Sequence, residues 1–219
     1  MPNPLDKVLE LQIQRTMNAL EANNMEAHYV ARADQVKDFV AQMIPEGATV
    51  ANGGSATLAE TGVLDLLSNG KYNFLDRRTV TGEALDKLFH DCFNADWYLA
   101  SSNAVTEKGE LFNVDGNSNR VAAITFGPKN VLLIVGCNKI VPDLAAAQAR
   151  VKTIAAPANT IRLNCKTPCA VTGQCADCHS PARRASSNRP CSAIRSTRES
   201  MRRYKASRSG SFRISNSAW

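Results

Sequence analysis

The sequence lacks any long hydrophobic run. None of its apolar stretches approaches the roughly 18 residues that a membrane-spanning helix needs. The N-terminus also lacks a charged region followed by an apolar stretch, which is the pattern of a secretory signal. We therefore expect no membrane span and a cytoplasmic protein. The 219 residues suffice for one large domain, or for one domain with an appendage.

Acidic residues are almost absent from the C-terminal part of the chain. Residues 183–219 contain ten lysines and arginines and one acid, Glu199, whereas the preceding residues contain 16 basic and 19 acidic ones. This tail is rich in Ser and Arg and lacks any plausible sheet strand, so we expect it to be largely disordered. Its arginines do not belong to a recognisable binding fold, so any contact with nucleic acid would be non-specific and driven by counterion release.

A disulfide framework is not expected, although the chain has seven cysteines. Without a secretion signal, cysteines indicate metal binding or redox chemistry. Four of them, Cys165, Cys169, Cys175 and Cys178, follow the pattern C-x3-C-x5-C-x2-C, and His179 could replace one thiolate. These thiolates can converge on an iron–sulfur cluster or, as the alternative, on zinc. The outer spacings match neither a common zinc ribbon nor a ferredoxin, and reduced, partly buried cysteines are the other interpretation.

Strand and helix patterns alternate before the cysteines. Hydrophobic periodicity predicts helices over residues 4–28, 33–43, 58–67, 81–93, 117–126 and 142–155, the last ended by Pro157. It predicts strands over 49–52, 72–76, 96–101 and 130–136, with a hairpin over 101–116. The continuous aliphatic run from Val131 to Val135 indicates a strand buried on both faces. The sequence therefore predicts an α/β fold with an open, mainly parallel sheet flanked by helices.

The loop Asn52-Gly53-Gly54-Ser55 separates an apolar strand from the start of a helical pattern. Two glycines allow a tight turn and the close approach of a ligand, and Ser55 can cap the helix. The N–H groups of such a turn favour a phosphate or a carboxylate. The alternative is that the glycines only make a tight connection.

Several motifs resemble the LUD domain family, which includes the lactate-utilisation protein C group. They are Ala51–Leu58, Asn113–Ala123, Phe126–Val131 and Gly136–Val141, within a resemblance that covers about residues 5–182. The resemblance implies a fold similar to ribose-5-phosphate isomerases, glucosamine-6-phosphate deaminases and CoA-transferases, with ligands at the carboxyl ends of the strands. It also implies an association with oxidation of lactate to pyruvate, alongside iron–sulfur and flavin-type partner proteins.

The polar stretch after the third strand adds candidate site residues. Asp115, with Glu107 across the hairpin, could act as a general base or orient a substrate hydroxyl. Arg120 could pair with a substrate carboxylate in bidentate fashion, and Asn113 and Asn119 complete the predicted ligand-binding set. The alternatives are a plain turn at Asp115 and a structural salt bridge at Arg120.

The chain departs from the family pattern after Ser180-Pro181-Ala182-Arg183. Relatives with this cysteine segment usually continue into another cysteine and a hydrophobic strand, but here the sequence is Arg184-Ala185-Ser186-Ser187. This change favours a reading-frame shift that replaced the native C-terminus, and the competing interpretation is a genuine basic tail. We therefore divide the chain into an N-terminal helix (1–30), a LUD-like α/β domain (31–164), a cysteine-rich metal-binding segment (165–182) and the basic tail (183–219).

Two classes of function follow. The first is a component of an iron–sulfur-dependent system that oxidises L-lactate to pyruvate, which binds a small anion at the glycine loop and works with oxidoreductase partner subunits. The alternative is a stand-alone enzyme acting on a phosphorylated sugar or an acyl-CoA. A regulatory or structural metal-binding module is a third, weaker class. The sequence does not decide whether the chain is itself an enzyme, and it allows a homo-oligomer.

Overall fold

The computed structural model describes residues 3–178, 194–195 and 209–215. The strands are β1 (Glu26–Val30), β2 (Thr49–Asn52), β3 (Asn73–Leu75), β4 (Trp97–Ala100), β5 (Ala104–Thr106), β6 (Leu111–Asn113), β7 (Asn130–Gly136), β8 (Ile140–Val141), β9 (Ile194–Arg195) and β10 (Ser209–Ser215). The helices are α1 (Pro4–Ala22), α2 (Val36–Met43), α3 (Ala56–Glu60), α4 (Val63–Leu67), α5 (Gly82–Asp91), α6 (Asn119–Phe126), α7 (Leu144–Arg150), α8 (Ala156–Arg162) and α9 (Pro168–Thr172). Four short segments of other helix types are η1 (Ala33–Gln35), η2 (Cys92–Asn94), η3 (Cys137–Lys139) and η4 (Val151–Ala155), the last a π-helix.

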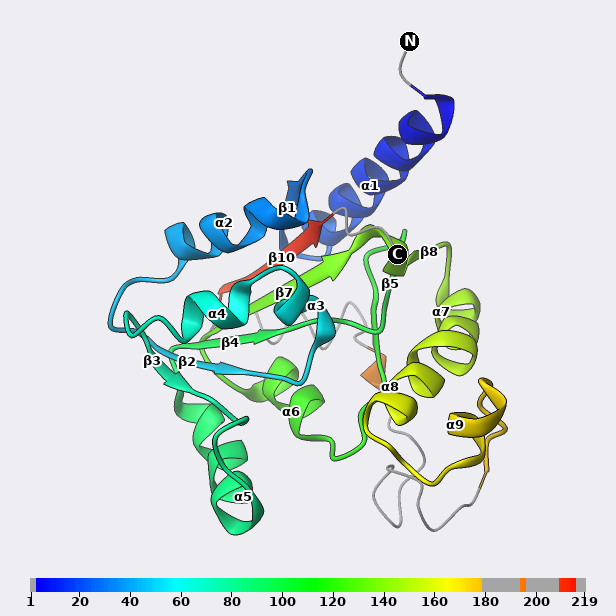
Figure 1. Cartoon of the computed structure of the whole chain (residues 1–219). Helices are drawn as coiled ribbons and strands as arrows, with labels where there is room; N and C mark the ends of the chain where they lie inside the picture. Colours follow the sequence, from blue (N-terminus) through cyan, green and yellow to red (C-terminus); the bar gives the residue numbers. More distant parts are fainter. Residues whose placement is uncertain (1–2, 179–193, 196–208, 216–219) are drawn as a thin grey trace.

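A six-stranded sheet forms the centre of the molecule (Figure 1). Its order is β1-β10-β7-β4-β2-β3, and every neighbouring pair of strands is parallel. A second, four-stranded sheet in the order β8-β5-β6-β9 contains the β5–β6 hairpin. Helices flank the central sheet, so the predicted open, mainly parallel α/β fold is confirmed.

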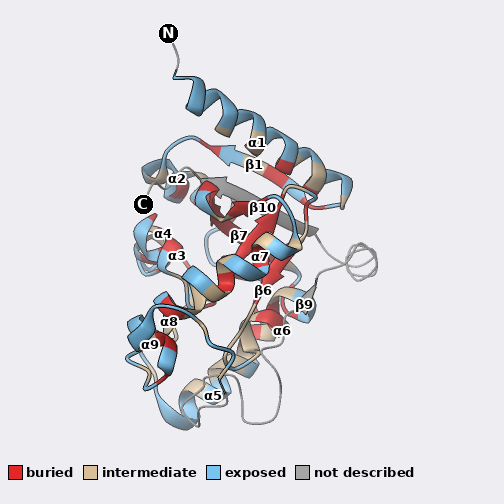
Figure 2. Ribbon diagram, turned by 90° about the vertical axis from the view of Figure 1, so that its right-hand side faces the viewer, coloured by how far each residue is buried: buried red, intermediate tan, exposed pale blue. Residues whose placement is uncertain are grey.

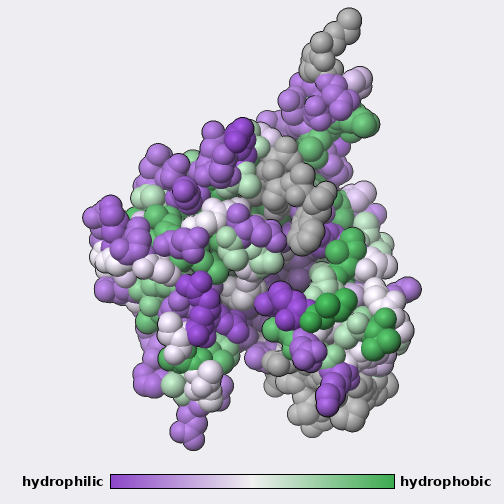
Figure 3. Space-filling model, viewed as in Figure 1, coloured by the Kyte–Doolittle hydropathy of each residue, from purple (hydrophilic) through white to green (hydrophobic). Residues whose placement is uncertain are grey.

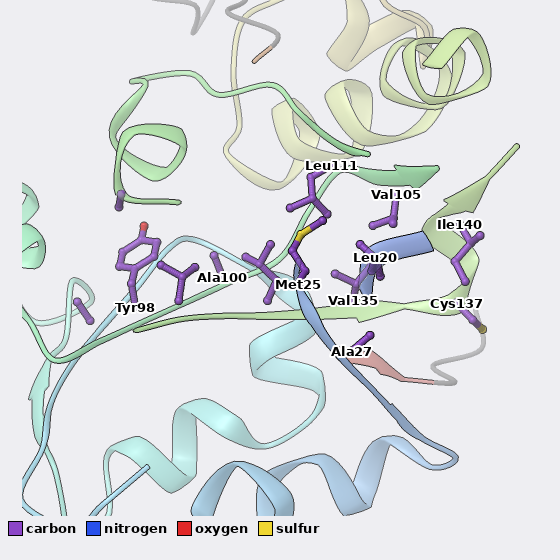
Figure 4. Close-up of a cluster of buried hydrophobic side chains, with 14 of the residues drawn as sticks. Leu20, Met25, Ala27, Tyr98, Ala100, Val105, Leu111, Val135, Cys137 and Ile140 are labelled. Atoms are coloured by element: carbon purple, nitrogen blue, oxygen red, sulfur yellow. The ribbon is translucent and has the colours of Figure 1, made fainter. Parts of the chain in front are cut away.

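Both faces of the central sheet carry a hydrophobic core. Leu132 and Ile134 of β7 pack on one face, against α2, α3 and α4. The alternate residues, Val131, Leu133 and Val135, belong to the core of the other face, which receives side chains from α1, α6 and the hairpin. Figure 4 shows part of this second core, and Figure 2 shows β7 buried in the middle of the molecule. The aliphatic run in β7 therefore forms the central, doubly covered strand that the sequence predicts.

The first helix is shorter than predicted. It ends at Ala22, not at residue 28, and Glu26–Val30 forms the edge strand β1. Asn24 has a positive φ of 65°, a backbone conformation that commonly ends helices and that Asn adopts more readily than most residues. The side chain of Asn23 also donates to the carbonyls of Lys108 and Gly109 in the hairpin turn. Local backbone conformation and contacts with the hairpin thus end the helix earlier than the hydrophobic periodicity predicts.

The prediction that no sheet strand follows residue 183 is wrong. β10 lies between β1 and β7 and pairs with both, so that Phe212 is opposite Ala27 on one side and Leu133 on the other. Ladder hydrogen bonds join backbone groups, so the short alternation of Phe212 and Ile214 with polar residues suffices within a segment rich in Ser and Arg. The remaining tail residues for which disorder was expected, and His179, lie outside the described residues.

Pro157 does not end the last long helix. It lies in the first turn of α8, directly after the π-helical segment η4. Proline lacks an N–H and is tolerated in the first turn of a helix, where that N–H has no intrahelical partner. The helical path therefore continues through Pro157 to Arg162.

Four of the exposed large apolar side chains lie between η4 and α9. Ile154, Ile161, Leu163 and Val171 are all exposed, and green apolar residues are visible in this region of Figure 3.

In the described residues, no helix is both long and apolar enough to cross a membrane.

Candidate anion-binding site

The glycine loop connects β2 to α3 as predicted. Ser55 precedes α3, and its hydroxyl oxygen accepts a hydrogen bond from the Leu58 N–H at 3.3 Å, which confirms the predicted helix cap. The Gly53 N–H donates to the Leu99 carbonyl at 2.8 Å and extends the β2–β4 ladder by one residue. This N–H is therefore engaged in the sheet, whereas the Gly54 and Ser55 N–H groups have no backbone acceptor within the described part of the chain.

Side chains pack closely against both glycines. A Cβ atom at Gly53 would lie 3.0 Å from Arg120 Cδ and 3.0 Å from the Tyr98 hydroxyl oxygen. A Cβ atom at Gly54 would lie 3.2 Å from a terminal nitrogen of Arg77. Contacts this short are tighter than ordinary van der Waals packing, so the absent side chains let two guanidinium-bearing side chains approach the loop.

Asn52, the last residue of β2, has an unsatisfied acceptor. The side chain is buried, and its amide nitrogen donates to the Gly53 carbonyl at 3.1 Å. Its Oδ1 atom is the one buried side-chain polar atom in the described residues that has no hydrogen-bond partner. Such an atom destabilises the fold in the absence of a partner, which is characteristic of functional sites.

Lys139 brings a cation to the same edge of the sheet. Its ammonium group donates to the Thr57 hydroxyl at 2.8 Å and to the Ser101 hydroxyl at 3.0 Å. No carboxylate forms a salt bridge with it among the described residues. Burial lowers the pKa of Lys139 to about 8, and repulsion by Arg150 acts in the same direction. The charge is therefore only partly compensated.

The parallel sheet explains why these residues meet. Asn52 ends β2, Ser101 follows β4, and Lys139 lies three residues after the end of β7. In a parallel sheet the carboxyl ends of all strands lie at one edge, where open α/β folds bind their ligands. Asn52 is paired with Leu99 across the ladder, so Ser101 lies one step further along the same face of β4.

Arg120 is held by protein acceptors. One terminal nitrogen donates to the Ser101 carbonyl at 2.9 Å and to Asn113 Oδ1 at 2.7 Å. The other donates to Asn103 Oδ1 at 3.0 Å and to the Val114 carbonyl at 3.0 Å. The guanidinium, predicted to bind a substrate carboxylate, thus joins three loops through both terminal nitrogens. Burial lowers its pKa, and nearby Asp115 opposes that effect.

Asp115 and the two predicted asparagines support this arrangement. Asp115 Oδ2 accepts from the N–H groups of Arg120 at 2.8 Å and Val121 at 3.1 Å, so the carboxylate satisfies the start of α6. Asn119 is the first residue of α6, and Asn113 is used as an acceptor by Arg120. In this geometry Asp115 caps a helix. The sequence predicted a general base or a hydroxyl-orienting group at this position.

Glu107 lies apart from the glycine loop. Asn103, which contacts Arg120, precedes β5, and Glu107 follows it. At 3.3 Å per residue the Cα atoms of these two residues are roughly 13 Å apart. The carboxylate of Glu107 accepts from Gln12 at 2.9 Å and forms a two-pronged ion pair with Arg15, also at 2.9 Å. The structure therefore places Glu107 against α1, and it does not bring Glu107 and Asp115 together through these contacts.

Glu107→Ala is expected to lower the free energy of unfolding by about 0.5–1 kcal/mol, because the ion pair is partly exposed. The loss should shrink at high salt, since exposed charge pairs are screened. Chemical denaturation at low and high salt measures it. Glu83→Ala, on exposed α5, is the matched control. An effect on ligand affinity without one on stability would contradict this structural role.

The four cysteines of the predicted metal site are not brought together. Cys169 is buried, and its sulfur lies 3.3 Å from the Thr167 hydroxyl. Cys165, Cys175 and Cys178 are partly exposed. In the part of the chain that the structure describes, no three Cys, His, Asp or Glu side chains are close enough to hold one metal ion. Metal binding by these cysteines stays a prediction.

These features define an α/β protein that gathers cations at the carboxyl ends of parallel strands. The LUD domain family matches residues 13–202, and the chain belongs to this family. At the level of the family, it is a lactate-utilisation-related protein. No curated protein matches the chain.

One solved structure supports the fold over nearly the whole chain. A DUF162 family protein from Deinococcus radiodurans is 11% identical, with a TM-score of 0.53 over 95% of this chain and 98% of that one. Ribose 5 phosphate isomerase A from Neisseria gonorrhoeae is 14% identical over 51% of this chain and 54% of that one, with a TM-score of 0.35. The eIF2B delta protein from Chaetomium thermophilum is 21% identical over 50% and 48%, also with a TM-score of 0.35. At 11% identity the likeness to the first structure concerns the fold alone.

Sequence reasoning missed Lys139, although it lies in one of the motifs that resemble the family. The signal that could have identified it is its position, three residues after the most apolar strand of the chain. A charged residue so close to the carboxyl end of a central parallel strand lies at the edge where ligands bind.

Proposed function

We propose that the protein is a component of a lactate-utilisation system and binds a small anionic ligand between the glycine loop and Lys139. The observation that carries this proposal is the ammonium group of Lys139, which is partly buried and bonded to two hydroxyl groups but to no carboxylate among the described residues. An anion at this position would compensate the charge and could also accept hydrogen bonds from the loop N–H groups.

The neighbouring cations support the same conclusion. Arg120 donates to side-chain amide oxygens and carbonyls, and Arg150 donates to the carbonyls of Asn103 and Asn138. Neither forms an ion pair with a carboxylate in the described residues. Three cations at one edge of the sheet create a positive potential that attracts anions.

The oxidation step is assigned to partner proteins in this proposal. Family membership relates the chain to lactate utilisation, and iron–sulfur oxidoreductase subunits would accept the electrons. This role does not require a metal bound to this chain. The protein would contribute ligand binding and the orientation of a small acid.

Calorimetric titration of the intact protein with lactate, pyruvate and inorganic phosphate at low ionic strength tests the binding. We expect saturable binding of at least one of these anions, weakened by added salt because the site is cationic. Absence of saturable binding by all three would overturn the anion site.

Growth of cells on lactate tests the assignment to lactate utilisation. Cells that lack the chromosomal copy should regain growth on lactate when they express the wild-type chain, but not when they express Lys139→Met.

The alternative function, a stand-alone enzyme acting on a phosphorylated sugar or an acyl-CoA, predicts turnover of such a substrate by the isolated chain. Growth on lactate that never depends on the protein would overturn the first function in favour of the alternative.

A further inference from the structure

Arg77 approaches the glycine loop from the edge of the sheet. It follows β3 by two residues, and β3 is the neighbour of β2. A terminal nitrogen of Arg77 lies 3.2 Å, and its Cζ atom 3.7 Å, from the position that a Cβ atom of Gly54 would occupy. Its guanidinium also lies over the ring of Phe89, with Cζ 5.1 Å from the ring centroid. The aromatic ring and the missing side chain together hold this cation beside the loop.

Arg77 differs from the arginine next to it in its partners. Arg78 forms an ion pair with Asp76 at 2.6 Å and also donates to the Ser68 hydroxyl at 2.9 Å. Arg77 makes no salt bridge with any carboxylate in the residues that the structure describes. Stacking on an aromatic ring leaves the edge of a guanidinium, with its N–H donors, available for a planar or tetrahedral oxyanion.

The two cations lie at opposite ends of one short segment. Lys139 is bonded to Thr57, and Arg77 lies against Gly54. Thr57 is three positions after Gly54, so their Cα atoms are at most about 11 Å apart. Each cation can bind one anionic group at hydrogen-bonding distance. A ligand with two anionic groups separated by a few bonds can contact both.

We propose that Arg77 is a specificity-determining residue that selects a small carboxylic acid carrying a phosphate group, with one anionic group bound at Lys139 and the other at Arg77. This inference rests on the proposed anion site and names the class of its ligand. Gly54 contributes to the same site, because a side chain at this position would crowd the guanidinium of Arg77 against the loop.

The test compares three probes by calorimetry on the full chain. The probes are 3-phosphoglycerate, which has both groups, glycerate, which has only the carboxylate, and glycerol 3-phosphate, which has only the phosphate. For the wild-type protein we expect the first probe to bind at least about tenfold more tightly than either of the others, because a second charge-assisted contact forms. Equal affinity for 3-phosphoglycerate and its tighter single-group analogue would overturn the inference.

Substitution of Arg77 locates the second contact. Arg77→Gln should reduce the advantage of 3-phosphoglycerate to less than about threefold, while the affinity for one single-group probe stays within about twofold of wild type. Arg78→Gln is the matched control and should leave the affinities for all three probes unchanged. Thermal unfolding of both variants verifies that they are folded. If Arg77→Gln behaves as Arg78→Gln does, Arg77 does not select the ligand.

Failure of the underlying anion site would look different. In that case none of the three probes would bind the wild-type protein, and Lys139→Met would change nothing. Binding of the single-group probes that depends on Lys139 but not on Arg77 would keep the proposed function and reject only this inference.

Discussion

Replacing Arg120 with alanine is expected to lower the free energy of unfolding by about 3 kcal/mol. The two terminal nitrogens of Arg120 donate to the side chains of Asn103 and Asn113 and to two backbone carbonyls. Asn113 is buried, and its Oδ1 atom would keep only a long bond of 3.4 Å from the Asn103 N–H. Buried acceptors that lose their donors each destabilise a fold by about 1–3 kcal/mol.

The contacts of Arg120 also explain why lysine should not replace it. An ammonium group is a compact donor and cannot span four acceptors that are arranged around a planar fork. Arg120→Lys is therefore expected to recover less than half of the stability lost in Arg120→Ala. Denaturant midpoints at constant slope measure both effects.

Arg162→Ala is the matched control for this experiment. Arg162 is exposed, and its side chain is bonded to Asn159 on the same helix, so the change should stay within about 0.5 kcal/mol. If Arg120→Ala unfolds at the wild-type denaturant midpoint but loses affinity for a confirmed anion, Arg120 binds substrate and does not serve mainly as a structural clamp.

Local patterns in the sequence predicted the elements that local physics determines. The run Val131–Val135 indicated a strand covered on both faces, and the structure places β7 in the middle of the central sheet. The glycine loop followed from two glycines, a capping serine and the hydrophobic periods on each side of them, and Ser55 makes the predicted cap. In both cases the information lies within fewer than ten residues.

Contacts between distant segments determined what the sequence did not predict. β1 has β10 as its neighbour in the sheet, and about 180 residues separate the two strands in the chain. The roles of Glu107 and Asp115 depend on which N–H groups fold against them, which are those of α1 and α6. A carboxylate in a polar loop has the same sequence signature whether it caps a helix or takes a proton.

Lys139 shows the same limit for the site itself. Its partners, Thr57 and Ser101, are 82 and 38 residues away in the chain, and only the parallel sheet brings them together. The sequence therefore located the loop but not the cation beside it. Removal of the Lys139 charge should have opposite effects on stability and on anion binding.

Lys139→Met is expected to raise the free energy of unfolding at pH 7 by about 1–2 kcal/mol and to weaken anion binding at least tenfold. Burial lowers the pKa of Lys139 from 10.5 to about 8, so the folded protein holds this proton less tightly than the unfolded chain does. Between about pH 8 and 10.5 the unfolded state binds more protons, and the contribution of Lys139 to stability therefore rises with pH. Methionine has a similar length without the charge and should remove this dependence.

The pH profile of binding has the opposite sign and separates the two effects. Above about pH 8 the ammonium group of Lys139 loses its proton, so the affinity of the wild-type protein for inorganic phosphate should fall as stability rises. Lys71→Met is the control, because Lys71 is an exposed lysine that pairs with Glu46, away from the glycine loop. Calorimetry and denaturant unfolding from pH 7 to 10 measure both quantities. If Lys139→Met destabilises the protein at pH 7 and binds phosphate as wild type does, Lys139 has a structural role and the anion site lies elsewhere.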